Sequence, residues 1–147
     1  MGLFNNNKVQ VSNQRSKYGF LEFEWKFDKE AIEKAVDELD LKLPVKIWMD
    51  RRLGVGGEHW VHKNKKHKIW ISLDSPKHWA NISLWHEFCH CIQSEQYDSH
   101  EDFMDAYNEA GGNMYYGTSY DENKFELEAI EFANSMNHKK LVKRVWI

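Results

Sequence analysis

The segment 84–92 constrains the fold of this chain more than any other, because it places charged and titratable residues inside an apolar run. In a helix, successive residues are about 100° apart, so His86 and His90 project from one face, about 40° apart and one turn from each other. Apart from Glu87, the residues around them carry no charge, so the helix can be buried on both sides of that face: Leu84, Phe88, Cys89, Cys91 and Ile92. We therefore predict a buried helix with two imidazoles on one face.

The pattern His-Glu-x-x-His at positions 86–90 has a chemical meaning as well. Two imidazoles one turn apart can bind one zinc ion. Glu87 lies about 60° round from His90, close enough to accept a proton from a water but badly placed to be a third ligand. The segment predicts a zinc hydrolase with Glu87 as general base, and the alternative is a core helix whose two histidines are satisfied by hydrogen bonds.

Composition limits the class of protein. The 147 residues are of single-domain size, and 41% hydrophobic residues with seven Trp provide ample material for a core. The net charge of -3 gives no general reason to bind nucleic acid or an anionic membrane. Without an apolar leader or an apolar run of membrane-spanning length, we expect a cytoplasmic location and no membrane partner.

The two cysteines, Cys89 and Cys91, point about 160° apart on the expected helix, so they cannot form a disulfide with each other. We interpret them as small core residues of a protein in a reducing compartment. A Cys-x-Cys metal site is the weaker interpretation, because a helix does not make these two thiols converge.

Hydrophobic periodicity and capping residues predict an α+β fold in one domain, with residues 1–16 flexible. The expected helices are Lys29–Leu39 after the cap Asp28, a helix from Asp74-Ser75-Pro76 to about Tyr97, a short helix from the polar segment 98–105 to Gly111-Gly112, and Asn123–Asn137. The expected strands are Tyr18–Phe27, Val45–Met49 and a hairpin of Glu58–His62 with Lys68–Leu73, and residues 139–144 would finish the chain as a strand.

A catalytic zinc site needs three protein ligands and an open fourth position. The last expected helix offers three acidic residues, Glu126, Glu128 and Glu131. Glu131 lies farthest from the apolar stripe of this helix, whereas Glu126 and Glu128 flank the stripe on opposite sides. The spacing alone leaves both as candidates.

The segment Glu126–Ala133, Glu-Leu-Glu-Ala-Ile-Glu-Phe-Ala, resembles the E-x-E-A-x-x-F-A signature that follows H-E-x-x-H in ImmA/IrrE-type metallopeptidases, and its Glu-Ala-Ile resembles the ligand helix of thermolysin-like gluzincins. The resemblance implies that Glu128 is the third ligand. It also implies a minimal zincin-like domain, in which a small mixed or antiparallel sheet packs on the active-site helix and a C-terminal helix supplies the ligand. Cys89 stands where the family usually has Gly, and Ile130 where it has Asn. Such departures fit a separate phage or mobile-element branch.

Motif and resemblance together predict a peptidase that uses one zinc ion to hydrolyse a peptide bond of an intracellular protein. The substrate would extend along the edge of Lys68–Leu73. Four side chains are candidates for stabilising the oxyanion, namely Tyr115, Tyr116, Tyr120 and His100. Three carboxylates are candidates for orienting His86 or His90, namely Asp102, Asp105 and Glu109.

A basic cluster at the expected hairpin tip gives the alternatives. It contains Lys63, Lys65, Lys66, His67 and Lys68, beside His59, Trp60 and His62. We interpret it first as a solvated turn. The other interpretation is that its cations contact phosphates while Trp60 or Trp70 stacks on bases. Two functions thus stand against the peptidase: a non-catalytic metal-binding module and a nucleic-acid-associated adaptor.

Overall fold

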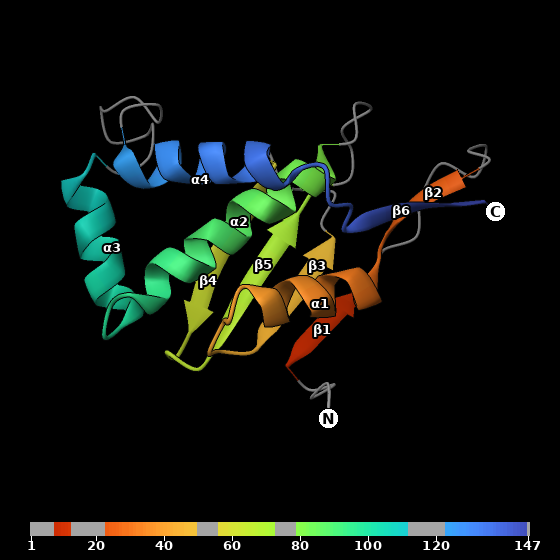
Figure 1. Ribbon diagram of the computed structural model, residues 1–147. Coiled ribbons are helices and arrows are strands. Elements are labelled where there is room, and N and C mark those ends of the chain that lie inside the picture. The colour runs from red at the N-terminus through yellow and green to blue at the C-terminus, as the bar shows by residue number, and fades with distance from the viewer. Residues whose placement is uncertain (1–7, 13–22, 50–55, 73–78, 112–122, 147) are drawn as a thin grey trace.

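The computed structural model describes residues 8–12, 23–49, 56–72, 79–111 and 123–146. Within these ranges the chain has an α+β fold (Figure 1). The helices are α1 (Lys29–Glu38), α2 (Ala80–Glu95), α3 (His100–Glu109) and α4 (Lys124–Met136). The strands are β1 (Val9–Ser12), β2 (Phe23–Phe27), β3 (Val45–Met49), β4 (Gly57–His62), β5 (Lys66–Ile71) and β6 (Val142–Trp146).

The larger sheet is mixed and has the strand order β1-β3-β5-β4. Strands β1, β3 and β5 are parallel, and β4 runs antiparallel to β5 through a hairpin. Alternate residues of β3 and β5 are buried, which gives the sheet one apolar face containing Ile47 and Ile69. Strands β2 and β6 form a separate antiparallel ribbon.

The expectation of a substrate edge at Lys68–Leu73 is wrong, because β5 is paired on both sides. The edge of the sheet next to β5 is β4. A strand's place within a sheet depends on pairing with distant segments, which alternation within one strand does not report.

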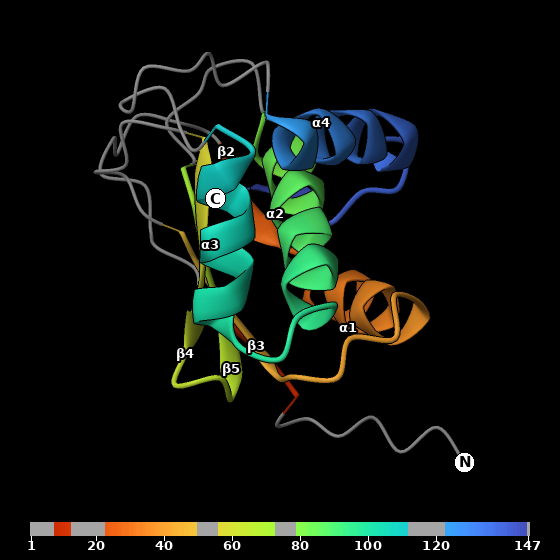
Figure 2. The ribbon, with the colours of Figure 1, turned by 90° about the vertical axis from the view of Figure 1, so that its left-hand side faces the viewer.

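Helices α1, α2 and α4 lie on one side of the larger sheet (Figure 2). Helix α2 packs against β4, β5 and α4, so it is buried on more than one side, as its sequence predicts. Leu84, Trp85 and Phe88 are almost wholly buried there. No helix of the described part is long and apolar enough to cross a membrane.

Capping residues mark the helix starts. Oδ1 of Asp28 accepts a hydrogen bond from Ala31 N at 3.2 Å, as predicted. Ser99 caps α3 in the same way and Asn123 caps α4, with Oδ1 2.9 Å from Phe125 N. Helix α3 therefore begins at His100, inside the segment expected only to lead into it. The expected cap at Asp74-Ser75-Pro76 lies outside the described residues.

The N-terminal region was expected to be flexible up to residue 16, and this is wrong for Val9–Ser12, which form β1. This strand pairs with β3, and Val9 is buried in the core. Val9 and Val11 alternate with polar residues, but a four-residue strand in an Asn-rich segment carries too weak a pattern to be recognised.

Candidate metal centre

Helix α2 presents His86, Glu87 and His90 toward the same point. One donor atom from each of these side chains lies within 4.8 Å of the other two. Glu87 and His90 are only 5% and 8% exposed, and His86 is half-buried. The helical spacing of the motif therefore produces the expected cluster.

A carboxylate from α4 completes this cluster. Oε1 of Glu126 lies 2.5 Å from Nε2 of His90 and 3.5 Å from Nε2 of His86. Glu126 stands in the first turn of α4 and is 2% exposed. The packing of α4 on α2 thus brings donors from two helices together.

Glu128 does not occupy this position, which corrects the expectation that the resemblance gave. Residues two apart on a helix point about 160° from each other, so Glu126 and Glu128 cannot both face the imidazoles. Glu128 is exposed, and its Oε1 accepts a hydrogen bond of 2.8 Å from Nε2 of Gln93. Of the two candidates that periodicity left open, Glu126 is the one that lies against the imidazoles.

Gln93 orients the second histidine. Its Oε1 lies 2.7 Å from Nδ1 of His90, and its Nε2 donates to the backbone oxygen of Phe125 at 2.9 Å. Because the amide oxygen can only accept, Nδ1 of His90 carries the proton, and Nε2 faces Glu126. This residue was missed, although it lies one turn after His90 on the same helix.

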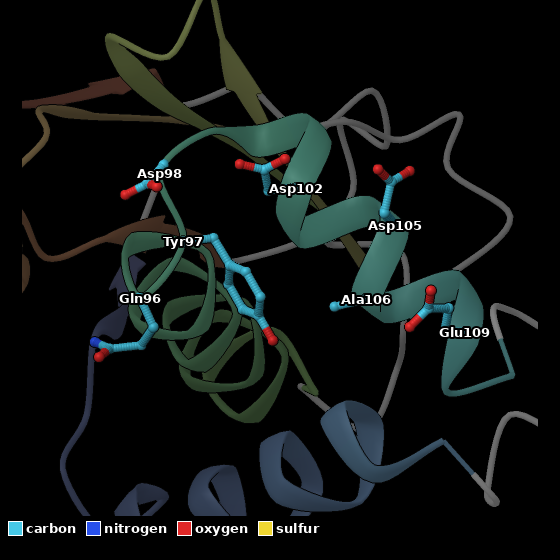
Figure 3. Close-up of a pocket in the computed structure, with 7 residues that line it drawn as sticks. All are labelled: Gln96, Tyr97, Asp98, Asp102, Asp105, Ala106 and Glu109. Carbon is cyan, nitrogen blue, oxygen red and sulfur yellow. The ribbon is translucent and has the colours of Figure 1, made fainter.

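The carboxylates expected to orient the histidines lie elsewhere. Asp102, Asp105 and Glu109 are exposed on α3 and line a hollow of about 390 Å³ with Tyr97 (Figure 3). The amide of Gln93 fills the position at His90 for which these acids were candidates.

Glu87 is a buried carboxyl beside the imidazoles. Burial raises its pKa, and the charges of Glu126 and Glu58 add to this, whereas those of His90 and His86 oppose it. Its Oε2 is buried without a hydrogen-bond partner among the residues described. Gly57 permits this placement, since a Cβ there would lie 3.1 Å from Cγ of Glu87. A buried carboxyl oxygen left open in this way can accept a proton from a reactant.

The charge of His90 is coupled to these acids. Burial opposes its protonation, but the hydrogen bond to Glu126, the charges of Glu87 and Glu126 and the hydrogen bond to Gln93 raise its pKa to about 9. In the absence of an ion, His90 and Glu126 therefore form a buried ion pair. A divalent cation would take the place of that proton.

Helix α3 contributes a phenol that sequence reasoning missed. The ring of Tyr107 lies 6.4 Å from that of His90. Burial, the charges of Glu126 and Glu87 and a side-chain hydrogen bond to Glu126 raise the pKa of Tyr107. The apolar residues around Tyr107 on α3 did not indicate that its phenol would lie beside Glu126.

The expected oxyanion donors are only partly placed. Tyr115, Tyr116 and Tyr120 lie outside the described residues. His100 lies at the start of α3 beside β4, with its ring 4.5 Å from that of Trp60 and 6.2 Å from that of His59. The structure thus associates His100 with the edge strand.

Lys63, Asn64 and Lys65 are exposed, as predicted for a solvated turn, but His67 of the same cluster lies on β5 and is fully buried. Lys63 and Asn64 adopt left-handed φ values of 52° and 58°, and Oδ1 of Asn64 accepts from His100 N at 2.7 Å. Trp70 stacks on Trp48 at 5.1 Å, whereas Trp60 is 51% exposed. Nucleic-acid binding by the tip stays a prediction, with Trp60 as its more accessible aromatic residue.

The two cysteines diverge, as predicted. Sγ of Cys89 lies 3.9 Å from Oε1 of Glu128, and burial together with Glu128 raises the pKa of Cys89 to about 12. Cys91 faces His59 and His67 of the sheet, within 4.8 Å between donor atoms. Both thiols are free and buried.

The described His, Glu and Cys side chains are thus positioned so that they could hold a metal ion. Comparison of the chain with models of protein families, with curated proteins and with solved structures finds no match. The function is argued below from the geometry of the site.

Proposed function

We propose that this chain is a zinc-dependent peptidase with a minimal zincin-like domain, in which His86, His90 and Glu126 are the metal ligands. The observation that carries the proposal is the approach of both imidazole Nε2 atoms to one oxygen of Glu126. The buried carboxyl of Glu87 beside them supports a hydrolytic rather than a purely structural site.

The donor set fits zinc. With zinc–ligand bonds of about 2.0–2.1 Å, donors in a tetrahedral site lie about 3.3 Å apart. The 3.5 Å between His86 and Glu126 matches this spacing, and the 2.5 Å between His90 and Glu126 would open by less than about 1 Å. Two imidazoles and one carboxylate leave the open position that catalytic zinc requires.

The chain's own groups then account for the proton transfers of amide hydrolysis. A zinc ion at this place would polarise the scissile carbonyl and increase the acidity of a water. Glu87 accepts the proton of the attacking water and passes it to the leaving nitrogen as the carbon–nitrogen bond breaks. The phenol of Tyr107, which is hydrogen-bonded to Glu126 in the ion-free site, would turn its O–H to the carbonyl oxygen as negative charge develops there.

The edge strand β4 is the proposed place for the substrate. Ser72 N donates to Gly56 O at 3.0 Å, so Gly56 forms a hydrogen-bonded pair with Ser72. Hydrogen-bonded and non-hydrogen-bonded pairs alternate along antiparallel strands, so His59 stands in a non-hydrogen-bonded pair and directs its backbone N–H and C=O away from β5. A peptide that adds to this edge as a further strand would pass Glu87, because Gly57 of β4 lies directly against that side chain.

The test begins with zinc content, measured by elemental analysis of protein reconstituted with zinc. We expect Glu126→Gln to lose one ion per chain relative to wild type, because it removes a charged ligand. We expect Glu128→Gln, the matched control on the same helix, to lose none. Equal zinc content in wild type and Glu126→Gln would contradict the assigned ligand set.

Hydrolysis is tested separately with Glu87→Gln. We expect it to retain zinc but to lose cleavage of a mixture of unstructured peptides, followed by mass spectrometry. Cleavage at the wild-type rate would exclude Glu87 as the base. If wild type binds zinc but cleaves no peptide, the alternative of a non-catalytic metal-binding module takes the place of the peptidase.

A further inference from the structure

A second cluster of donors lies on the sheet side of α2. His59 of β4, His67 of β5 and Cys91 of α2 each place one donor atom within 4.8 Å of the other two. His67 and Cys91 are 0% exposed. Cys91 packs within the hydrophobic core, and His67 is a fully buried imidazole beside it, whose ring nitrogens need polar partners.

The outer nitrogen of His67 is held in a way that is typical of metal-ligating histidines. Nε2 of His67 lies 2.6 Å from Oε2 of Glu95. The backbone N–H groups of Lys42 and Leu43 fix that carboxylate, at 2.8 and 3.3 Å. Since Nε2 donates its proton to Glu95, Nδ1 keeps its lone pair and points toward His59.

His100 supplies an independent observation beside this cluster. It is 8% exposed, and both ring nitrogens are buried without a hydrogen-bond partner among the residues described. Its ring lies 6.2 Å from that of His59. Buried imidazole nitrogens nearly always have a hydrogen-bond partner, so the open nitrogens of His100 indicate that the ring binds something else, such as a metal ion.

We propose that His59, His67 and Cys91 bind a second zinc ion, with His100 as the fourth ligand. Nε2 of His59 and Nδ1 of His67 are 2.9 Å apart, close to the spacing of about 3.3 Å between donors in a tetrahedral zinc site. Three imidazoles and one thiolate fill four positions, which is the pattern of a closed, structural site.

This site lies beyond the proposed peptidase centre and shares no ligand with it. The rings of His59 and His90 are 6.5 Å apart, so the two centres lie side by side along α2. The second ion would join β4, β5, α2 and the start of α3. It would therefore hold the edge strand at which we place the substrate.

The test uses the full chain stripped of metal and reconstituted with zinc or with cobalt(II). We expect two zinc ions per chain by elemental analysis, and a thiolate-to-cobalt charge-transfer band in the absorption spectrum. Cys91→Ser should bind one zinc ion and lose the band. Cys89→Ser is the matched control, because it changes another buried thiol of α2, and it should keep both ions and the band.

Further variants separate this proposal from the peptidase proposal. Glu126→Gln should lose one zinc ion yet retain the thiolate band. This result would show that the second site binds its ion independently of the first. If circular dichroism shows that Cys91→Ser does not fold, His59→Gln serves as a second variant, because His59 is only half-buried and its replacement disturbs the core less. Absence of the thiolate band in folded wild-type protein would overturn the second site, whatever the zinc content of the first.

Discussion

Gln93 shows how much of the metal centre depends on a residue that is not itself a ligand. It accepts a hydrogen bond from Nδ1 of His90 and donates to Phe125 O and to Glu128, so one amide joins α2 to α4. Such hydrogen bonds fix the direction of the ligating nitrogen. The amide therefore positions His90 toward Glu126.

Replacing Gln93 by Leu should weaken zinc binding at this centre by about 10–100-fold, because the ring of His90 loses the acceptor that orients it. The measurement is a zinc titration in competition with a chromophoric chelator. Gln96→Leu is the control, since Gln96 is exposed and its side-chain amide donates to the backbone oxygen of Ile92 at 3.4 Å. Unchanged affinity in folded Gln93→Leu would show that His90 needs no such support.

Residue-level prediction succeeded where helical geometry alone decides and failed where packing decides. His86, Glu87 and His90 converge because they share one helix. The choice between Glu126 and Glu128 depends on how α4 is rotated against α2, which no local pattern in α4 encodes. The family signature was matched to Glu128, but the structure places Glu126 at the imidazoles.

At the scale of elements, the contact between β4 and α2 depends on the absence of a side chain. A Cβ at Gly57 would lie 3.0 Å from Cδ1 of Ile71, 3.1 Å from Cγ of Glu87 and 3.2 Å from the backbone oxygen of Trp70. A Cβ at Gly56 would lie 2.8 Å from the hydroxyl of Ser83, which can rotate away. Two adjacent glycines thus differ in what surrounds them.

We expect Gly57→Ala to lower the free energy of unfolding by about 1–3 kcal/mol, because it overpacks the contact between the strand and the helix. Gly56→Ala should have an effect near zero or slightly stabilising, since alanine restricts the unfolded chain more than glycine does. Urea denaturation of both variants gives the comparison. A Gly57→Ala protein as stable as Gly56→Ala would mean that β4 and α2 can separate without loss.

Helices and strands with a clear local pattern were predicted correctly, and those with a weak pattern were missed. Helix α1 and strand β3 carry clear periodicity and were predicted almost to the residue, and the hairpin of β4 and β5 was also confirmed. The four residues of β1 were missed. The edge position of β4 could not be predicted either, because it is set by which strands pair across the whole sheet.

At the scale of the whole molecule, α2 is the element on which both proposed centres depend. His86 and His90 face α4, whereas Cys91 faces the sheet. Asn81 ties the same helix to the chain after α4, since its side chain donates to Lys139 O at 3.2 Å and accepts from Leu141 N at 2.6 Å. Ions in both centres would join this helix to α4, to both hairpin strands and to α3.

Zinc should therefore raise the thermal unfolding midpoint of the wild-type chain. An ion present at about 100 times its dissociation constant stabilises the native state by about 2.7 kcal/mol per site. For a chain of this size that corresponds to about 5–11 °C per site. Differential scanning calorimetry with zinc and with chelator measures the increase, and calcium, which prefers oxygen ligands, should give none.

Variants of the two centres measure how much each centre contributes to the zinc-dependent increase in the unfolding midpoint. Glu126→Gln and Cys91→Ser should each show a smaller zinc-dependent increase than wild type, and the double variant should show almost none. Because each variant is compared with itself in chelator, any direct loss of stability from the substitution cancels. An increase of wild-type size in the double variant would place the stabilising zinc elsewhere on the chain, and both centres would lose this support.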